Sequence, residues 1–137
     1  VADQHVTYIE LDLTTVTATA GTIIDDAAFI PKGAFIEEVK VINRVAATGS
    51  GALLNLGLMN YDRTTEIDNN GLLAAAAITD WNAAGETVVY RVGSTYAGAL
   101  IGTKTTAAGY LCADYDTAVF TAGAIAIEVR YSFNNQV

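Results

Sequence analysis

The 137-residue chain contains one cysteine, one proline, one histidine and one tryptophan, and the scarcity of cysteine and histidine excludes several kinds of site. With Cys112 alone, no internal disulfide can form, so packing or association must stabilise the fold. A histidine-based catalytic triad would depend on His5, which lies in a segment without the pattern of a rigid element. One histidine and one distant cysteine do not make a zinc site.

Charge is also scarce, since charged residues make up only 16% of the chain. Acidic side chains outnumber basic ones by 15 to 7, which gives a formal charge of −8. The basic residues are scattered, whereas a nucleic-acid-binding surface needs a basic stripe. The longest apolar stretch, at 71–78, is far shorter than the ~20 residues of a membrane-spanning helix. We expect no binding to nucleic acid or membrane, and no signal peptide is visible.

Carboxylates are the remaining groups that could support acid–base catalysis or bind calcium. Asp114 and Asp116 form one candidate pair. The stretch 62–71 is similar to the first half of a calcium-binding loop, but Ala77 stands where the closing glutamate would be. Neither pattern completes a site, so we expect no catalytic residue, no metal site and no cofactor.

Apolar and polar residues alternate along much of the chain, which predicts half-buried β-strands. The segment 123–133 is the clearest, with Ile125, Ile127 and Val129 on one face. In the segment 34–45 we expect Phe35 and Val45 to share the face of the other valines. Further strands are expected at 6–13, 52–60, 86–92 and 108–115.

Turn-forming stretches separate these segments at a spacing typical of a sandwich or barrel. We expect residues 1–137 to form one all-β domain, an antiparallel β-sandwich or jelly-roll-like fold of roughly seven to nine strands. One short helical insert is expected near residues 71–80, with its helix at about Leu72–Ile78, because leucine and alanine dominate there. Residues 1–5 lack a core-forming pattern, so we expect a mobile N-terminal arm.

The order of four segments resembles that of small head proteins of tailed bacteriophages. The turn IPKGAFI leads into the strand VKVINRV, and the glycine-bearing LLNLGLMN follows. The stretch IDNNGLLAAAAITDWN and the terminal TAGAIAIEVRY complete the series. This succession, from Ile30 to Tyr131, is similar to that of decoration or cement proteins and of related β-sandwich modules in phage head fibres.

The resemblance implies a structural virion protein that is not an enzyme. Proteins of this type commonly form homotrimers on the outer surface of an icosahedral capsid, where they stabilise contacts between capsomers. The implied partners are the major capsid protein and further copies of the chain, and the implied location is the virion, after assembly in the host cytoplasm. The arm and exposed loop groups are the candidate partner contacts: Val1, Ala2, Asp3, Gln4, His5, Tyr61, Arg63, Asp80 and Trp81.

Two rival hypotheses remain open. A carbohydrate- or receptor-binding β-sandwich module of a phage fibre would show an aromatic-rimmed pocket, with calcium near Asp68. Trp81 could stack on a sugar, anchor a protein partner or cover the core. A secreted or pilus-like structural subunit is the third hypothesis, and the lack of disulfides and of a visible signal peptide argues against it.

Overall fold

The structure, a computed structural model, describes residues 2–18, 22–23, 28–60, 62 and 65–134. Two short 3-10 helices, η1 (Leu13–Thr15) and η2 (Ile78–Trp81), accompany the strands. In this part of the chain no helix is long and apolar enough to cross a membrane. The strands are β1 (Ala2–Asp12), β2 (Thr22–Ile23), β3 (Phe29–Ile30), β4 (Phe35–Thr48), β5 (Leu53–Asn60), β6 (Glu66–Ala77), β7 (Thr87–Tyr90), β8 (Gly109–Asp116) and β9 (Ala122–Asn134).

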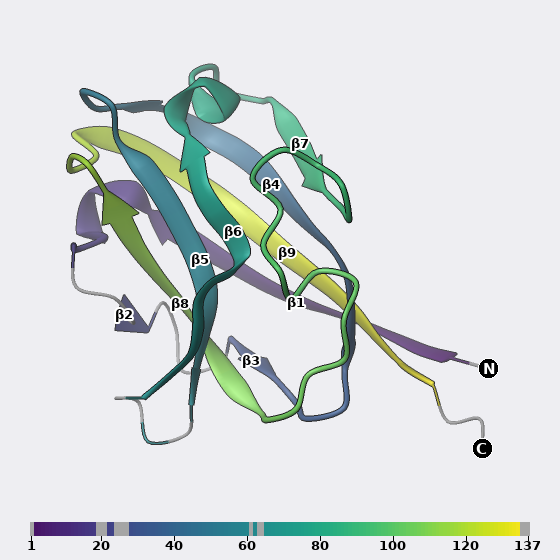
Figure 1. Cartoon of the computed structure of the whole chain (residues 1–137). Helices are drawn as coiled ribbons and strands as arrows, with labels where there is room; N and C mark the ends of the chain where they lie inside the picture. The colour runs from purple at the N-terminus through teal and green to yellow at the C-terminus, as the bar shows by residue number, and fades with distance from the viewer. Residues whose placement is uncertain (1, 19–21, 24–27, 61, 63–64, 135–137) are drawn as a thin grey trace.

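The strands form two antiparallel sheets that face each other (Figure 1). Sheet A has the order β1-β9-β4-β7, and sheet B has the order β2-β8-β5-β6, with β3 also paired to β8. The pairs are nested along the chain: β1 with β9, β2 and β3 with β8, β4 with β7, and β5 with β6. With β2 and β3 counted as one interrupted strand, this is the strand order of a jelly roll. The predicted all-β fold of two antiparallel sheets is confirmed.

The hydrophobic core lies between the two sheets. Leu54, Leu56 and Leu58 of β5 alternate inward from sheet B, and each is completely buried. Burying side chains of this size contributes about 1.5–3 kcal/mol each, so the facing rows supply most of the stabilisation. Sheet A contributes Ile36, Val39, Val41, Ile125, Ile127 and Val129.

Alternation located β4 and β9 but not the bulges within β4. The predicted strand at 123–133 is confirmed as β9. In β4 the prediction for Phe35 and Val45 is wrong, because their side chains are 40% and 52% exposed. The pairing of β4 with β9 shifts register between Ile36 and Glu38 and again near Val45. Each shift reverses which residues face the core, since side chains alternate with a period of two.

The predicted helix at Leu72–Ile78 is wrong. Residues 72–77 belong to strand β6, and the helical residues are those of η2, one turn later. Alanine and glycine occur here because another segment approaches the backbone of β6 closely. The amide of Ala74 donates to the carbonyl of Tyr96 (2.9 Å), and the amide of Gly98 donates to the carbonyl of Leu72 (3.1 Å).

The segment 96–105 therefore covers one side of the sandwich. Beyond Gly98 it continues along β4, where the amide of Gly102 donates to Ile36 (2.7 Å). A side chain on Gly98 would overlap the backbone of Gly71. The hydrogen bonds between the backbones of β6 and the segment 96–105 thus require small residues on both sides. Helix propensity alone takes the alanines of β6 as a sign of a helix.

The expected mobile arm is wrong for residues 2–5. They are the first residues of β1 and pair with the end of β9, where Ala2 lies opposite Asn134 and His5 lies opposite Tyr131. Figure 1 shows the start of β1 and the end of β9 side by side. The polar side chains of residues 3–5 show no alternation of apolar and polar residues. Pairing through backbone hydrogen bonds does not require such a pattern. Val1 lies outside the described residues.

Gly57 of β5 lies against the backbone of β6. A β-carbon there would overlap the carbonyl oxygen of Asp68. We predict that Gly57→Ala lowers the free energy of unfolding by about 2–3 kcal/mol, because the strands must separate to make room. Urea unfolding followed by tryptophan fluorescence measures the loss.

Gly33→Ala is the matched control. Gly33 has a φ of +84° but no atom within 4 Å of the added carbon, so only the backbone strain of about 1 kcal/mol remains. Equal losses in the two variants would contradict the close crossing of β6 over Gly57.

Candidate functional site

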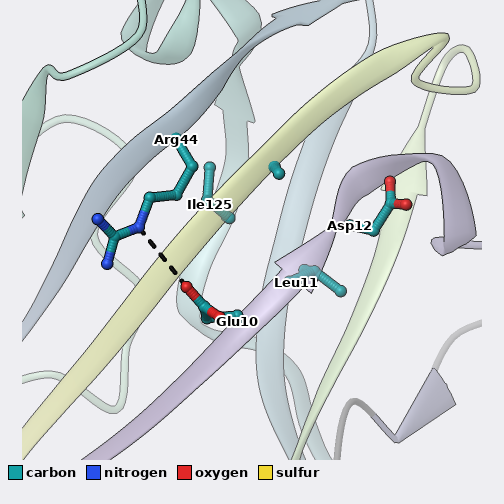
Figure 2. A pocket seen from close by; sticks show the side chains of 6 residues that line it. Glu10, Leu11, Asp12, Arg44 and Ile125 are labelled. Atoms are coloured by element: carbon teal, nitrogen blue, oxygen red, sulfur yellow. Dashed lines mark ion pairs between the residues drawn. The ribbon is translucent and has the colours of Figure 1, made fainter.

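A hollow of about 470 Å³ opens on the outer face of sheet A, over β9 (Figure 2). It arises because Ala124, at its floor, is small, while the neighbouring strands carry longer side chains. Asp12 of β1 and Val45 of β4 pair with Ala124 from either side. The hollow is lined by Glu10, Leu11, Asp12, Arg44, Ala124 and Ile125.

Arg44 extends from β4 across β9 toward β1, as Figure 2 shows. Its Nε lies 3.6 Å from Oε1 of Glu10, and its Nη2 donates to the hydroxyl of Tyr8 (3.0 Å). The Tyr8 hydroxyl donates to Oε1 of Glu10 (3.4 Å). The hydrogen bond to Tyr8 raises the pKa of the guanidinium above its ordinary value. These groups are exposed to solvent, so the network fixes side-chain positions more than it stabilises the fold.

Asp12 forms the other wall of the hollow. Its Oδ1 accepts hydrogen bonds from the backbone amide of Thr14 (3.0 Å) and from its hydroxyl (2.7 Å). These bonds lower the pKa of the carboxyl group and cap η1. No described residue of the lining is a histidine, cysteine, serine or lysine. The hollow therefore presents paired charges that suit a polar contact and no nucleophile or neutral-pH base.

The structure does not bring the predicted partner contacts onto one surface. Gln4 and His5 are exposed on β1, near the chain ends. Asp80 lies in η2, away from the chain ends (Figure 1), and accepts a hydrogen bond from the hydroxyl of Tyr90 (2.8 Å). Burial and this carboxylate raise the pKa of Tyr90. The side chains of Ala2 and Asp3 are not described, and three candidates lie outside the described residues: Val1, Tyr61 and Arg63.

Trp81 is a core residue, and its assignment as a partner contact is wrong for the folded chain. Its side chain is completely buried. The Nδ2 of Asn43 donates to the carbonyl of Trp81 (2.8 Å) and holds η2 against β4. Of the three roles considered for this residue, covering the core is confirmed. A ring with no exposed surface does not stack on a sugar.

An aromatic cluster that the sequence did not reveal lies at the end of the β1–β9 ribbon. The ring of His5 stacks on that of Tyr131, with centroids 5.4 Å apart. The edge of Phe133 completes the cluster, 5.6 Å from His5. His5 and Tyr131 are paired across the strands, so the register of β1 places them together.

Asp114 and Asp116 converge on the outer face of sheet B, because residues two apart on a strand share a face. The Nδ2 of Asn55 donates to both carboxylates, at 2.7 Å to Asp114 and 2.9 Å to Asp116. Asn69 donates to the second oxygen of Asp114 (3.2 Å), and Oδ1 of Asn55 accepts from the amide of Ala75 (2.8 Å). The cluster ties β6 across β5 and β8. Its hydrogen bonds are those of a structural anchor.

Neither a metal site nor a reactive thiol emerges from the described residues. These residues contain no group of three or more histidine, cysteine, aspartate or glutamate side chains placed to hold a metal. Cys112 lies buried beside the carboxylate cluster. Burial, with a contribution from Asp114, raises the pKa of its thiol to about 12.

No protein-family model and no curated protein sequence matches the chain. Three solved structures share its fold. A chain in the capsid of Ralstonia phage GP4 superposes with a TM-score of 0.60 at 20% identity, over 98% of this chain and 86% of that chain. A chain of the cyanophage Pam1 capsid gives 0.55 at 16% identity, over 97% and 85%. A chain of the capsid of Helicobacter pylori bacteriophage KHP30 gives 0.55 at 12% identity, over 97% and 94%.

These comparisons define the class of fold. The chain has the jelly-roll sandwich that occurs in chains of phage capsid structures, and the likeness extends over almost its whole length. Because the identities are low, the likeness concerns the fold alone.

We predict that Asn55→Ala lowers the free energy of unfolding by about 3 kcal/mol, because the buried carboxylate of Asp114 and the amide of Ala75 lose a hydrogen-bond partner, as does the exposed carboxylate of Asp116. Chemical denaturation measures the change. Asn70→Ala is the matched control. This exposed neighbour should shift stability by less than about 0.5 kcal/mol. A small effect of Asn55→Ala would show that β6 is held by other contacts.

We predict that the Cys112 thiol does not react with a disulfide reagent at pH 8 in the folded protein, since it stays protonated and buried. Reaction should be complete and fast in denaturant. The absorbance of the released thiolate measures both rates. Rapid labelling of the native protein would place the thiol at an accessible surface and contradict this assignment.

Proposed function

We propose that the protein is a structural component of a tailed-phage virion that binds the outer surface of the icosahedral shell. The supporting observation is the fold likeness over 97–98% of this chain to chains in three phage capsid structures. The proposed role is mechanical rather than catalytic.

In this role the protein stabilises contacts between capsomers through binding energy. A ligand that binds only the assembled lattice stabilises it by mass action. We propose that the chain acts as a homotrimer with the major capsid protein as its partner. Three linked contacts add through effective concentration, so each contact can be small.

The chemistry of the chain is compatible with such a role. Its formal charge of −8 disfavours adhesion to DNA, which is the other polymer present during assembly. Its buried single thiol needs no oxidising compartment, which fits assembly in the host cytoplasm before release in the virion. Gln4, His5 and Asp80 remain the proposed contacts with described side chains.

The alternative of a sugar-binding fibre module needs an exposed aromatic residue on which a sugar can stack. Its aromatic platform was Trp81, which is completely buried. The hollow of Figure 2 carries paired charges and an aliphatic floor rather than an aromatic rim.

The test is binding of the purified chain to shells of the cognate phage that lack it. We predict co-sedimentation that saturates at a copy number set by the lattice, and a higher temperature of shell disruption measured by light scattering. Bovine serum albumin at equal concentration controls for trapping. Absence of saturable binding to both immature and expanded shells would contradict the proposal, and specific signals on a glycan array would favour the fibre module instead.

A further inference from the structure

The outer edge of β1 is an open sheet edge of unusual length. This strand has 11 residues, and among the described residues β9 is the only strand paired with it in sheet A. The other edges are short or covered in the described part of the chain. Strand β7 has 4 residues and β2 has 2, while the segment 96–100 donates and accepts hydrogen bonds along β6.

β1 lacks three of the features that usually prevent edge-to-edge pairing, and its only charged residues are the acidic Asp3, Glu10 and Asp12. Such edges commonly carry proline, lysine or a bulge. The sequence of β1, ADQHVTYIELD, contains neither residue, and its pairing with β9 runs without a register shift. Val6 and Tyr8 are 47% and 49% exposed on its outward face. The strand is thus long, free of bulges and partly apolar.

We propose that β1 pairs antiparallel with β1 of a second copy, around a two-fold axis at Thr7. The two copies of sheet A then form one continuous sheet. Such isologous contacts use the same surface on both copies. Thr7 is the midpoint of Ala2–Asp12, so this register is the one that pairs the strand over its entire length.

The side-chain pattern supports a second copy as the occupant. Pairing around Thr7 places Val6 opposite Tyr8 of the second copy, which is a favourable β-branched–aromatic pair. It places Gln4 opposite Glu10 of the second copy. No acidic residue then faces another directly, although each chain has a formal charge of −8.

Shifted registers lose this complementarity. An axis at Tyr8 would place Gln4 opposite Asp12 and Val6 opposite Glu10. An axis at Glu10 would bring two carboxylates face to face, which is destabilising. The charge pattern therefore favours the same register that gives full-length pairing.

A two-fold contact does not close a trimer. If the chain forms the trimers proposed above, the β1 pair joins copies from neighbouring trimers. The contact itself concerns two isolated chains, so it can be tested without shells. Failure of shell binding would leave this result unaffected, and the reverse also holds.

The direct test is disulfide trapping with Val6→Cys/Tyr8→Cys. In the proposed register each new cysteine faces its counterpart on the second copy, within reach of a disulfide. We expect at least about tenfold more covalent dimer after mild oxidation than with Val6→Cys alone, where no cysteine lies opposite. Val45→Cys, exposed on the same sheet, controls for random collision.

A second variant tests the free energy of association. Val6→Lys places a charge at the paired edge, and we expect the dimer dissociation constant to rise at least about tenfold in sedimentation velocity. Val45→Lys should leave it unchanged, and thermal unfolding verifies that both variants fold. Higher salt should strengthen association of the wild type, because it screens the repulsion between acidic chains.

Three outcomes would overturn the proposal. The first is equal trapping of the double-cysteine variant and the Val45→Cys control. The second is dimer formed by Tyr8→Cys alone as efficiently as by the pair, which would indicate an axis at Tyr8. The third is a wild-type chain whose self-association is unaffected by Val6→Lys.

Discussion

The pairing of the first strand with the last is the constraint on which the rest of the structure depends. Strand β9 lies between β1 and β4, and it carries Ile125, Ile127 and Val129 into the core. The nested pairs of the jelly roll form inside this outermost pair. The hollow over Ala124 and the aromatic cluster at His5 occur on these same three strands. Contacts so distant in sequence also imply slow folding for a chain of this size.

Strict alternation made β9 and most of β4 predictable from the sequence, because a half-buried strand leaves a period of two. Strand β6 was not predictable in this way. Gly98 approaches the backbone of Gly71 closely, and the two residues are 27 positions apart in the sequence, so no local pattern reveals the contact. The bulges of β4 likewise depend on pairing partners, so the exposure of Phe35 and Val45 could not be inferred from their own segment.

In the candidate site, too, some features are predictable from the local sequence and others depend on partners distant in the sequence. The sequence identified Asp114 and Asp116 as a candidate carboxylate pair, and the structure places both within hydrogen-bond distance of Asn55. Their partner Asn55 comes from a strand more than fifty residues earlier, and no local pattern connects it to them. Trp81 could not be assigned because buried packing and partner contact favour the same residue type. Only the fold distinguishes the two roles.

The two faces of the sandwich differ in how their polar groups are arranged. Sheet B has its polar groups tied together beneath β6, whereas sheet A exposes charge pairs, a hollow and an open edge. The most direct measurement is an electron cryomicroscopy reconstruction of the phage shell that contains this chain. The account predicts density for a two-sheet sandwich at fixed lattice positions on the outside of the shell. Shells with no such density, or the chain only in fibres, would contradict it.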